Sequence, residues 1–261
     1  MSATAKIIKY QLKDVVRSRW LIGYTGFFLL AAELLLRFGG DPTKALVGLV
    51  NVVLLMIPLI ALVFGTIYIH DAREFTELLL AQPVARRELF AGLYLGLALS
   101  LSLGFAAGVG IPFLLRAGAG SIATLMVLLA IGIALTFVFT GLAFVIAIRW
   151  DDRVKALGVA VGVWLVAGIA YDAVVLVLAT TLANYPLERP LLALMLANPI
   201  DLSRVVLLLR LDISALMGYT GAVFKQFFGS GGGMLAAAVA LMGWIGAPVL
   251  LGSRTFRRKD F

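Results

Sequence analysis

Six long apolar segments constrain this chain more than any other feature of its sequence. They cover residues 20–36, 45–69, 89–115, 122–148, 157–182 and 234–251. A helix needs about 20 mostly apolar residues to cross the hydrocarbon of a bilayer, because every backbone amide must be bonded within the segment. The runs are continuous and do not alternate, which excludes a transmembrane barrel. The sequence therefore predicts an all-α integral membrane protein with six transmembrane helices.

The composition agrees with this fold class. Hydrophobic residues make up 62% of the 261 residues, charged residues make up 14%, and the mean hydropathy is +1.05. A soluble globular domain has about 25% charged residues. Cysteine is absent, so disulfides and thiolate metal ligands are excluded.

Lysine and arginine are concentrated in four regions that lie on one side of the predicted membrane. Fifteen of the 22 basic residues precede span one, join spans two and three, join spans four and five, or follow span six. Short loops rich in Lys and Arg stay in the cytoplasm, so we expect both termini and the loop at 70–88 to be cytoplasmic. The net charge of +8 then reflects topology and anionic lipid, and we expect no nucleic acid partner.

Two further segments have helical patterns. Residues 5–19 place basic residues on one side of a helix and apolar residues on the other, which predicts an interfacial amphipathic helix bound to membrane lipid; the alternative is a flexible basic tail. The external loop at 183–233 contains two broken apolar stretches, where we expect short helices that seal a dimer or dock an external protein. The candidate residues for an external contact or gate are Asn198, Pro199, Asp201 and Arg204.

The loop at 70–88 contains a short amphipathic helix. Phe75, Leu78 and Leu79 recur at i, i+3 and i+4 and so share one face, with charged residues around them. One interpretation is a helix packed on its own bundle. The sharper one is a coupling helix whose apolar ridge enters a groove on a cytoplasmic motor domain. The candidate contacts are Glu74, Phe75, Glu77, Leu78, Leu79, Arg86 and Arg87.

The sequence lacks the residues of an ATPase or hydrolase. There is no phosphate-binding loop ending in Gly-Lys-Ser or Gly-Lys-Thr, so the chain cannot hydrolyse ATP alone. The single histidine, His70, ends span two, and no cluster of catalytic side chains is readable. Copper(I) prefers thiolate and thioether ligands, yet cysteine is absent and the methionines show no paired spacing. We expect no catalytic residue, no metal site and no directly bound cofactor.

Three residues within the apolar segments have a carboxyl or amide side chain, namely Glu33, Asn51 and Asp172. A charged acid at mid-membrane costs roughly 2.5–3.5 kcal/mol, so each acid needs a partner or a place near an interface. Arg37 follows Glu33 by four residues and supplies such a partner. Asp172 has no basic residue within a turn; it has either a functional or assembly role, or that of a protonated core acid. We expect Asn51 to form a hydrogen bond between helices.

The order of these features resembles the permease subunits of type 2 ABC transporters. The resemblance is carried by the basic entry helix, the six spans, TELLLAQPVARRELFAGLYLG after span two and NPIDLSRVVLL before span six. It implies one transmembrane domain over residues 1–261. Within the family, LGVAVGVWLVAGIAYDAVVLVLA in span five, then NPIDLSR and a terminal FRRK, is most similar to the permeases of the nitrous oxide reductase maturation system.

This resemblance implies a homodimer in the bacterial inner membrane that binds two copies of a separate cytoplasmic ABC ATPase, which supplies ATP and Mg²⁺. It implies that the ATPase grips the loop after span two, and that a periplasmic β-helical protein sits on the external side. It also implies a role in copper-site maturation of the reductase, and Asp172 matches the acid of the span-five motif. The alternatives are an exporter of a lipid, glycan or peptide, and a non-transporting membrane scaffold.

Overall fold

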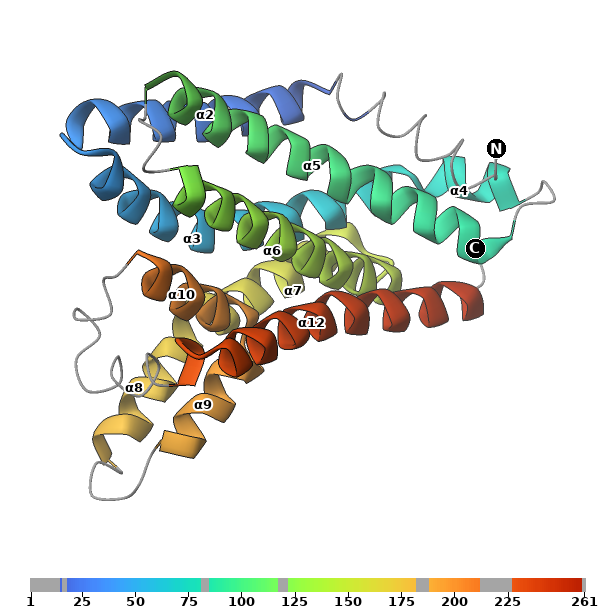
Figure 1. Cartoon of the computed structure of the whole chain (residues 1–261). Helices are drawn as coiled ribbons and strands as arrows, with labels where there is room; N and C mark the ends of the chain where they lie inside the picture. Colours follow the sequence, from blue (N-terminus) through green and yellow to red (C-terminus); the bar gives the residue numbers. More distant parts are fainter. Residues whose placement is uncertain are drawn as a thin grey trace.

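The computed structural model is an all-helical bundle, and the residues it describes are 15, 18–80, 85–116, 122–181, 188–211 and 227–259 (Figure 1). Its helices are α2 (Arg19–Phe38), α3 (Pro42–Asp71), α4 (Arg73–Leu80), α5 (Arg86–Arg116), α6 (Ile122–Arg149), α7 (Arg153–Leu165), η2 (Val166–Ala170, a π-helix), α8 (Tyr171–Thr181), α9 (Glu188–Ala197), α10 (Pro199–Arg210) and α12 (Gly231–Arg258). No strand occurs in these described ranges. The predicted all-α class is confirmed.

Within the described residues, six helical stretches are long and apolar enough to cross a membrane. They are α2, α3, α5, α6, the continuous stretch Arg153–Thr181 formed by α7, η2 and α8, and α12. Each corresponds to one predicted segment, so the six spans are confirmed. Several helices continue beyond the predicted limits because their terminal turns carry polar residues that an apolar run leaves out. Of the predicted interfacial helix at 5–19, all but Val15, Ser18 and Arg19 lies outside the described residues.

The helices begin where the sequence supplies a cap. The side chains of Ser18, Asp41, Asp152, Asn198 and Ser230 each accept a backbone N–H of the following first turn. Such caps satisfy donors that have no partner within the helix. Pro42 and Pro199 occupy the first helical turn, where a missing N–H costs nothing.

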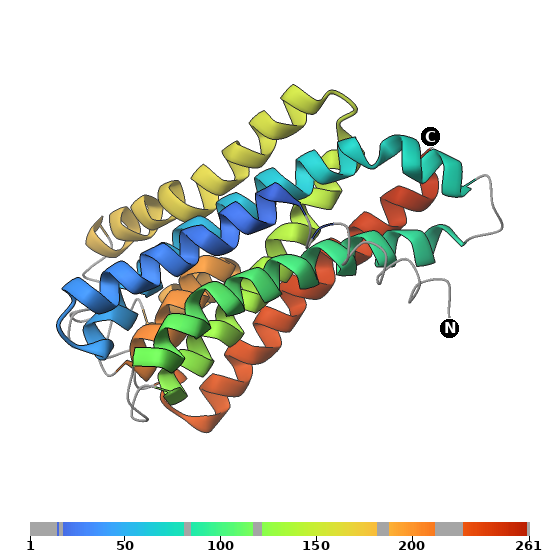
Figure 2. The same ribbon diagram turned by 90° about the horizontal axis from the view of Figure 1, so that it is seen from above.

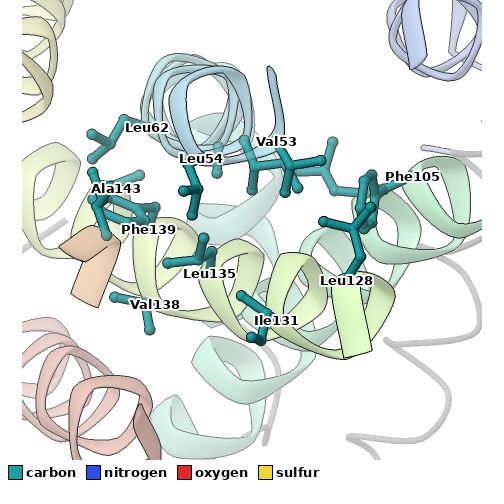
Figure 3. Packing of buried hydrophobic residues seen from close by; sticks show 14 of the residues in the cluster. Val53, Leu54, Leu62, Phe105, Leu128, Ile131, Leu135, Val138, Phe139 and Ala143 are labelled. Carbon is teal, nitrogen blue, oxygen red and sulfur yellow. The ribbon is translucent and has the colours of Figure 1, made fainter. Parts of the chain in front are cut away.

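The centre of the bundle is the contact between α3 and α6 (Figure 3). Its buried side chains include Val53, Leu54 and Leu62 from α3, and Leu135, Phe139 and Ala143 from α6. The two helices come close at Gly65, where an added Cβ would lie 2.6 Å from the Cβ of Ala143. A small residue at such a contact lets two membrane helices approach closely.

The pair α2 and α5 forms a second close contact beside this core. Gly104 and Gly108 lie one turn apart on α5 and both face α2. A Cβ at Gly108 would lie 2.7 Å from the carbonyl oxygen of Thr25 and 2.9 Å from the Cβ of Phe28. This spacing of two small residues is typical of tightly packed membrane helices.

Span five lies at the edge of the bundle. Figure 2 shows α7, η2 and α8 in line along one side of the molecule, next to α3. No residue of its most apolar 18-residue window is buried. The exposed side chains on this span are apolar, for example Leu165, Ile169 and Leu176. This face therefore contacts lipid or another protein chain.

Candidate functional site

The segment between spans five and six contains a sharp helix break. Helices α9 and α10 meet at Asn198 with a bend of 110°. They were expected as short helices in the outer interface; α10 instead packs against α3, α6 and α12, and most of its first nine residues are buried. The pair is therefore a re-entrant element that enters the bundle from the end opposite α4 (Figure 1).

Side chains from both neighbouring spans satisfy the backbone at this break. The last turn of α9 leaves carbonyl oxygens without helical donors; Tyr171 Oη donates to the carbonyl of Leu194 at 2.7 Å, and Trp244 Nε1 donates to that of Leu196 at 3.1 Å. Spans five and six thus hold α9 in place through specific hydrogen bonds.

Asn198 joins three parts of the chain at the break. Its Oδ1 accepts the N–H of Ile200 at 3.0 Å and so caps α10. Its Nδ2 donates to the carbonyl of Ala167 in the π-helix at 2.7 Å, and to Oδ2 of Asp201 at 3.1 Å. A π-helix within an α-helix is rare, and many of the known examples lie at functional sites. Here a carbonyl of the π-helix, that of Ala167, accepts the hydrogen bond from Asn198.

Two carboxylates share one guanidinium beside Asn198. Arg204 Nη1 lies 2.8 Å from both carboxylate oxygens of Asp172 on α8, and 3.0 Å from Oδ1 of Asp201 on α10. Asp201 is 2% exposed, whereas Asp172 and Arg204 are 41% and 30% exposed. With both acids ionised the cluster has a net charge of −1. The arrangement ties span five to the re-entrant helix with charge-assisted hydrogen bonds.

An apolar groove of about 570 Å³ lies next to this cluster. Its walls come from α6, α7, η2, the helix break and α12, and include Phe139, Val163, Ala167, Pro199 and Trp244. The polar side chains that reach it are those of Tyr171, Asn198 and Trp244. Such a lining suits an aliphatic chain and offers no site for a strongly charged group.

The structure thus brings together residues that are far apart in the sequence. Asn198, Pro199, Asp201 and Arg204 were expected as one external segment, and Asp172 as an acid without a nearby base. The partner of Asp172 is Arg204, which lies 32 residues further along the chain. A search for partners within one helical turn of Asp172 cannot find this pair. The sequence feature that could have indicated it is a basic residue, Arg204, within a second and interrupted apolar stretch.

The other intramembrane residues behave differently from each other. Glu33 bonds Arg37 at 2.9 Å, as expected, and also Arg116 at the end of α5 at 2.6 Å. Asn51 is exposed on α3. Its expected bond between helices is not seen in the part of the chain that the structure describes, because this side of α3 faces away from the neighbouring helices.

Helix α4 turns part of its apolar ridge toward its own bundle. Leu79 packs against the core, and Phe75 lines a cavity of about 610 Å³ together with Trp20 and Leu97. Leu78 is 69% exposed, and Glu74 and Glu77 are exposed beside it. Of the three predicted ridge residues, Leu78 is therefore the one that is available to another protein.

The two arginines after α4 also differ. Arg87 is exposed, whereas Arg86 donates from Nη1 to the carbonyls of Arg257 and Lys259 at 3.1 and 2.7 Å. A contact to a partner was expected of both. Arg86 is instead engaged with the C-terminal end of α12, a contact that a pattern of charges along one loop cannot predict.

The described residues contain no group of three or more His, Asp or Glu side chains that could hold a metal ion. Both ring nitrogens of His70 face carbonyl oxygens, Nδ1 that of Thr66 at 2.8 Å and Nε2 that of Trp150 at 3.2 Å. His70 therefore joins the end of α3 to the segment after α6 and has no ring nitrogen directed toward a ligand.

Comparison with known proteins gives consistent matches over the length of the chain. A model of the family described as ABC-2 family transporter protein matches residues 5–261. The chain is 27% identical to a probable ABC transporter permease protein NosY of Stutzerimonas stutzeri, over 99% of both chains. It is also 27% identical to a protein of the same name from Pseudomonas aeruginosa, over 97% of both chains.

Proposed function

Because the chain belongs to the ABC-2 family of transporter proteins and is a permease subunit, we propose that it couples ATP hydrolysis by a separate cytoplasmic ATPase to work on the other side of the membrane. The observation that carries this proposal is the outward face of α4. There Leu78 is 69% exposed, and two acids that precede it on the helix, Glu74 and Glu77, are exposed as well. An apolar anchor with a charged rim is the usual form of a protein contact.

The proposed assembly is a homodimer in the bacterial inner membrane, with one ATPase on α4 of each copy. ATP and Mg²⁺ then bind to the ATPase and not to this chain. The unburied apolar face of span five supports a contact with a second copy. Basic residues near the α4 end of the bundle, such as Arg73, Arg149 and Arg257, support a cytoplasmic position for that end.

On the external side, the cluster of Asp172, Asp201 and Arg204 is the proposed output of the coupling. It joins span five to the re-entrant helix α10, so a shift of span five would move the helix break. The likeness to relatives named NosY, together with the sequence motifs of span five, supports copper-site maturation of nitrous oxide reductase as the process served. A periplasmic β-helical protein is the proposed receiver of the motion.

Passage of copper through this chain is not part of the proposal. Soft copper(I) prefers thiolate and thioether ligands, and the chain has no cysteine and no paired spacing of its methionines. Transmission of motion requires only the mechanical links described above.

The apolar groove favours a second candidate, export of a lipid. Its volume of about 570 Å³ and its mostly apolar lining suit an acyl chain better than a glycan or a polar peptide, because sugars require many hydrogen-bond partners.

The test of the coupling proposal is copurification from the native host with a tag on this chain. We expect an ABC ATPase to copurify with the unmodified chain. Leu78→Asp should weaken this association roughly tenfold, because truncation or charge at an interface anchor costs about 1–2 kcal/mol. The chain should still insert and run as a folded protein in size-exclusion chromatography.

Leu79→Asp is the matched control for this test. Leu79 packs against the core of its own bundle, so the variant should lower thermal stability more than Leu78→Asp does. If no ATPase copurifies with the unmodified chain, the permease has no motor and the membrane-scaffold alternative is favoured.

A further inference from the structure

Lys259 connects two helix ends at the α4 side of the molecule. It follows directly after α12, and its Nζ donates to the carbonyl of Ile148 at 2.6 Å. Ile148 lies in the last turn of α6, where carbonyl oxygens lack helical donors and carry partial negative charge. The Lys259 ammonium thus caps α6 from the end of α12, and the side chain is 17% exposed.

Asp151 extends this contact to the coupling helix. It follows α6 and lies 2.8 Å from Lys259 Nζ and 3.6 Å from Arg73 Nη1. Arg73 is the first residue of α4 and also pairs with Glu77 at 3.2 Å. The hydrogen bond from Lys259 holds the pKa of Asp151 below its ordinary value, so this acid stays charged at neutral pH.

Arg86 brings the other flank of the coupling segment to the same place. It is the first residue of α5, and its guanidinium binds the carbonyls of Arg257 and Lys259. These carbonyls belong to the end of α12, so Arg86 caps that helix just as Lys259 caps α6. The first residue of the segment at 73–86 is therefore linked to Lys259 through Asp151, and the last contacts Lys259 directly.

A third link closes the arrangement from α3. His70 Nε2 faces the carbonyl of Trp150 at 3.2 Å, and Arg153 pairs with Asp71 at 2.8 Å. The segment after α6 is consequently held on one side by the end of α3 and on the other by Lys259. Single exposed ion pairs contribute little, but several contacts that share residues restrict relative motion of the elements they join.

We propose that Lys259 and Asp151 are positioning residues for the coupling helix: they fasten the start of α4 to the ends of α6 and α12, where Arg86 also holds the start of α5, so that these four ends move together. The inference extends the proposed coupling role of α4. A force applied to α4 then reaches spans four and six directly, and not only spans two and three, which flank the loop in sequence.

The test uses distances between spin labels in the isolated full-length chain in lipid discs. Because the chain has no cysteine, labels at Leu78→Cys on α4 and Arg254→Cys on α12, both exposed positions, report one distance. We expect a narrow distribution in the otherwise unmodified chain and a clearly broader one after Lys259→Met or Asp151→Asn. Lys259→Arg should retain the narrow distribution, since it keeps the charge and the donors.

Arg258→Met is the matched control, because it removes the same charge from the neighbouring, exposed residue. An unchanged distribution in both Lys259→Met and Asp151→Asn would overturn the proposal, and so would equal broadening in Arg258→Met. If Lys259→Met does not fold, Asp151→Asn decides the question alone. The distance measurement needs no ATPase, so it can be interpreted even if no ATPase copurifies with the chain. A negative distance result, in turn, would not change the interpretation of the copurification experiment.

In the complex with the ATPase, Lys259→Met should lower permease-stimulated ATP hydrolysis several-fold while the ATPase stays bound. If Lys259 only stabilised the fold, Lys259→Met would lower the melting temperature of the chain but would leave unchanged the ATP hydrolysis measured per bound ATPase.

Discussion

At the scale of single residues, the cluster around Arg204 is governed by charge balance. One guanidinium lies within 3.0 Å of two carboxylates, and the more buried acid, Asp201, also accepts from Asn198. Removing the base leaves two acids without compensation, whereas removing Asp172 leaves a neutral pair. Substitution of Arg204 and substitution of Asp172 should therefore lower the stability of the protein by different amounts, although both remove the contact between these two residues.

Arg204→Met should destabilise the protein by roughly 1–3 kcal/mol, less than the loss of a fully buried partner because the site is partly exposed. Asp172→Asn should cost less than about 1 kcal/mol, since the remaining pair is neutral. Thermal unfolding in lipid discs measures both. The double variant Arg204→Met/Asp201→Asn is the control, and it should recover part of the loss; a double variant less stable than Arg204→Met would contradict the charge-balance explanation.

The partner of a charged residue could be predicted from the sequence where that partner lies within one helical turn. The pairing of Glu33 with Arg37 follows from their spacing of four residues. The pairing of Asp172 with Arg204 depends on how the chain folds back after span five, and no local pattern encodes that. The exposure of Asn51 depends on which side of α3 faces α6, which a nearly uniformly apolar helix does not reveal.

At the scale of helices, the sequence predicted the number and approximate position of the spans, but not how far each helix extends or which face turns inward. The limits of the spans follow from a single requirement, enough apolar residues to cross the hydrocarbon. The face of α4 that turns inward depends on its contact with α3 and α5, so two of its three predicted outward residues lie against the bundle. The π-turn at 166–170 has no signal of its own in an apolar run.

The close contact of α2 and α5 provides a stability test at this scale. Gly108→Ala adds a Cβ 2.7 Å from the carbonyl of Thr25 and should destabilise the helix pair by about 1–3 kcal/mol, the usual cost of overpacking. Gly110→Ala on the same helix adds a Cβ with no atom within 4 Å. It should be neutral or slightly stabilising, because alanine favours the helix by about 1 kcal/mol.

Thermal unfolding of the two alanine variants side by side measures this difference. Equal melting temperatures would mean that α2 and α5 separate enough to accept a methyl group, and that their close approach contributes little to the fold.

At the scale of the whole molecule, the bundle has two chemically different ends. One end contains α4, the start of α5 and the end of α12, with the network around Lys259 (Figures 1 and 2). The other contains the turn after α2 and the start of α9, where the re-entrant pair enters the bundle. Coupling in such a molecule requires that a movement at the first end reach the second, and α6, α12 and span five extend between the two.

This polarity leads to a prediction about sidedness. Leu78 on α4 and Phe38 at the end of α2 are 69% and 84% exposed and lie at opposite ends. The chain contains no cysteine, so Leu78→Cys and Phe38→Cys each introduce one thiol. The excess of Lys and Arg at the α4 end predicts that this end is cytoplasmic.

A membrane-impermeant thiol reagent added to intact spheroplasts should label Phe38→Cys and leave Leu78→Cys unlabelled until the membrane is permeabilised. The unmodified chain should remain unlabelled under both conditions. The reverse pattern would place α4 outside, where no ATP-driven motor operates, and the coupling role of α4 would then fail. The fastening of α4 by Lys259 and Asp151 would still stand or fall on the spin-label distances, which do not depend on the side of the membrane.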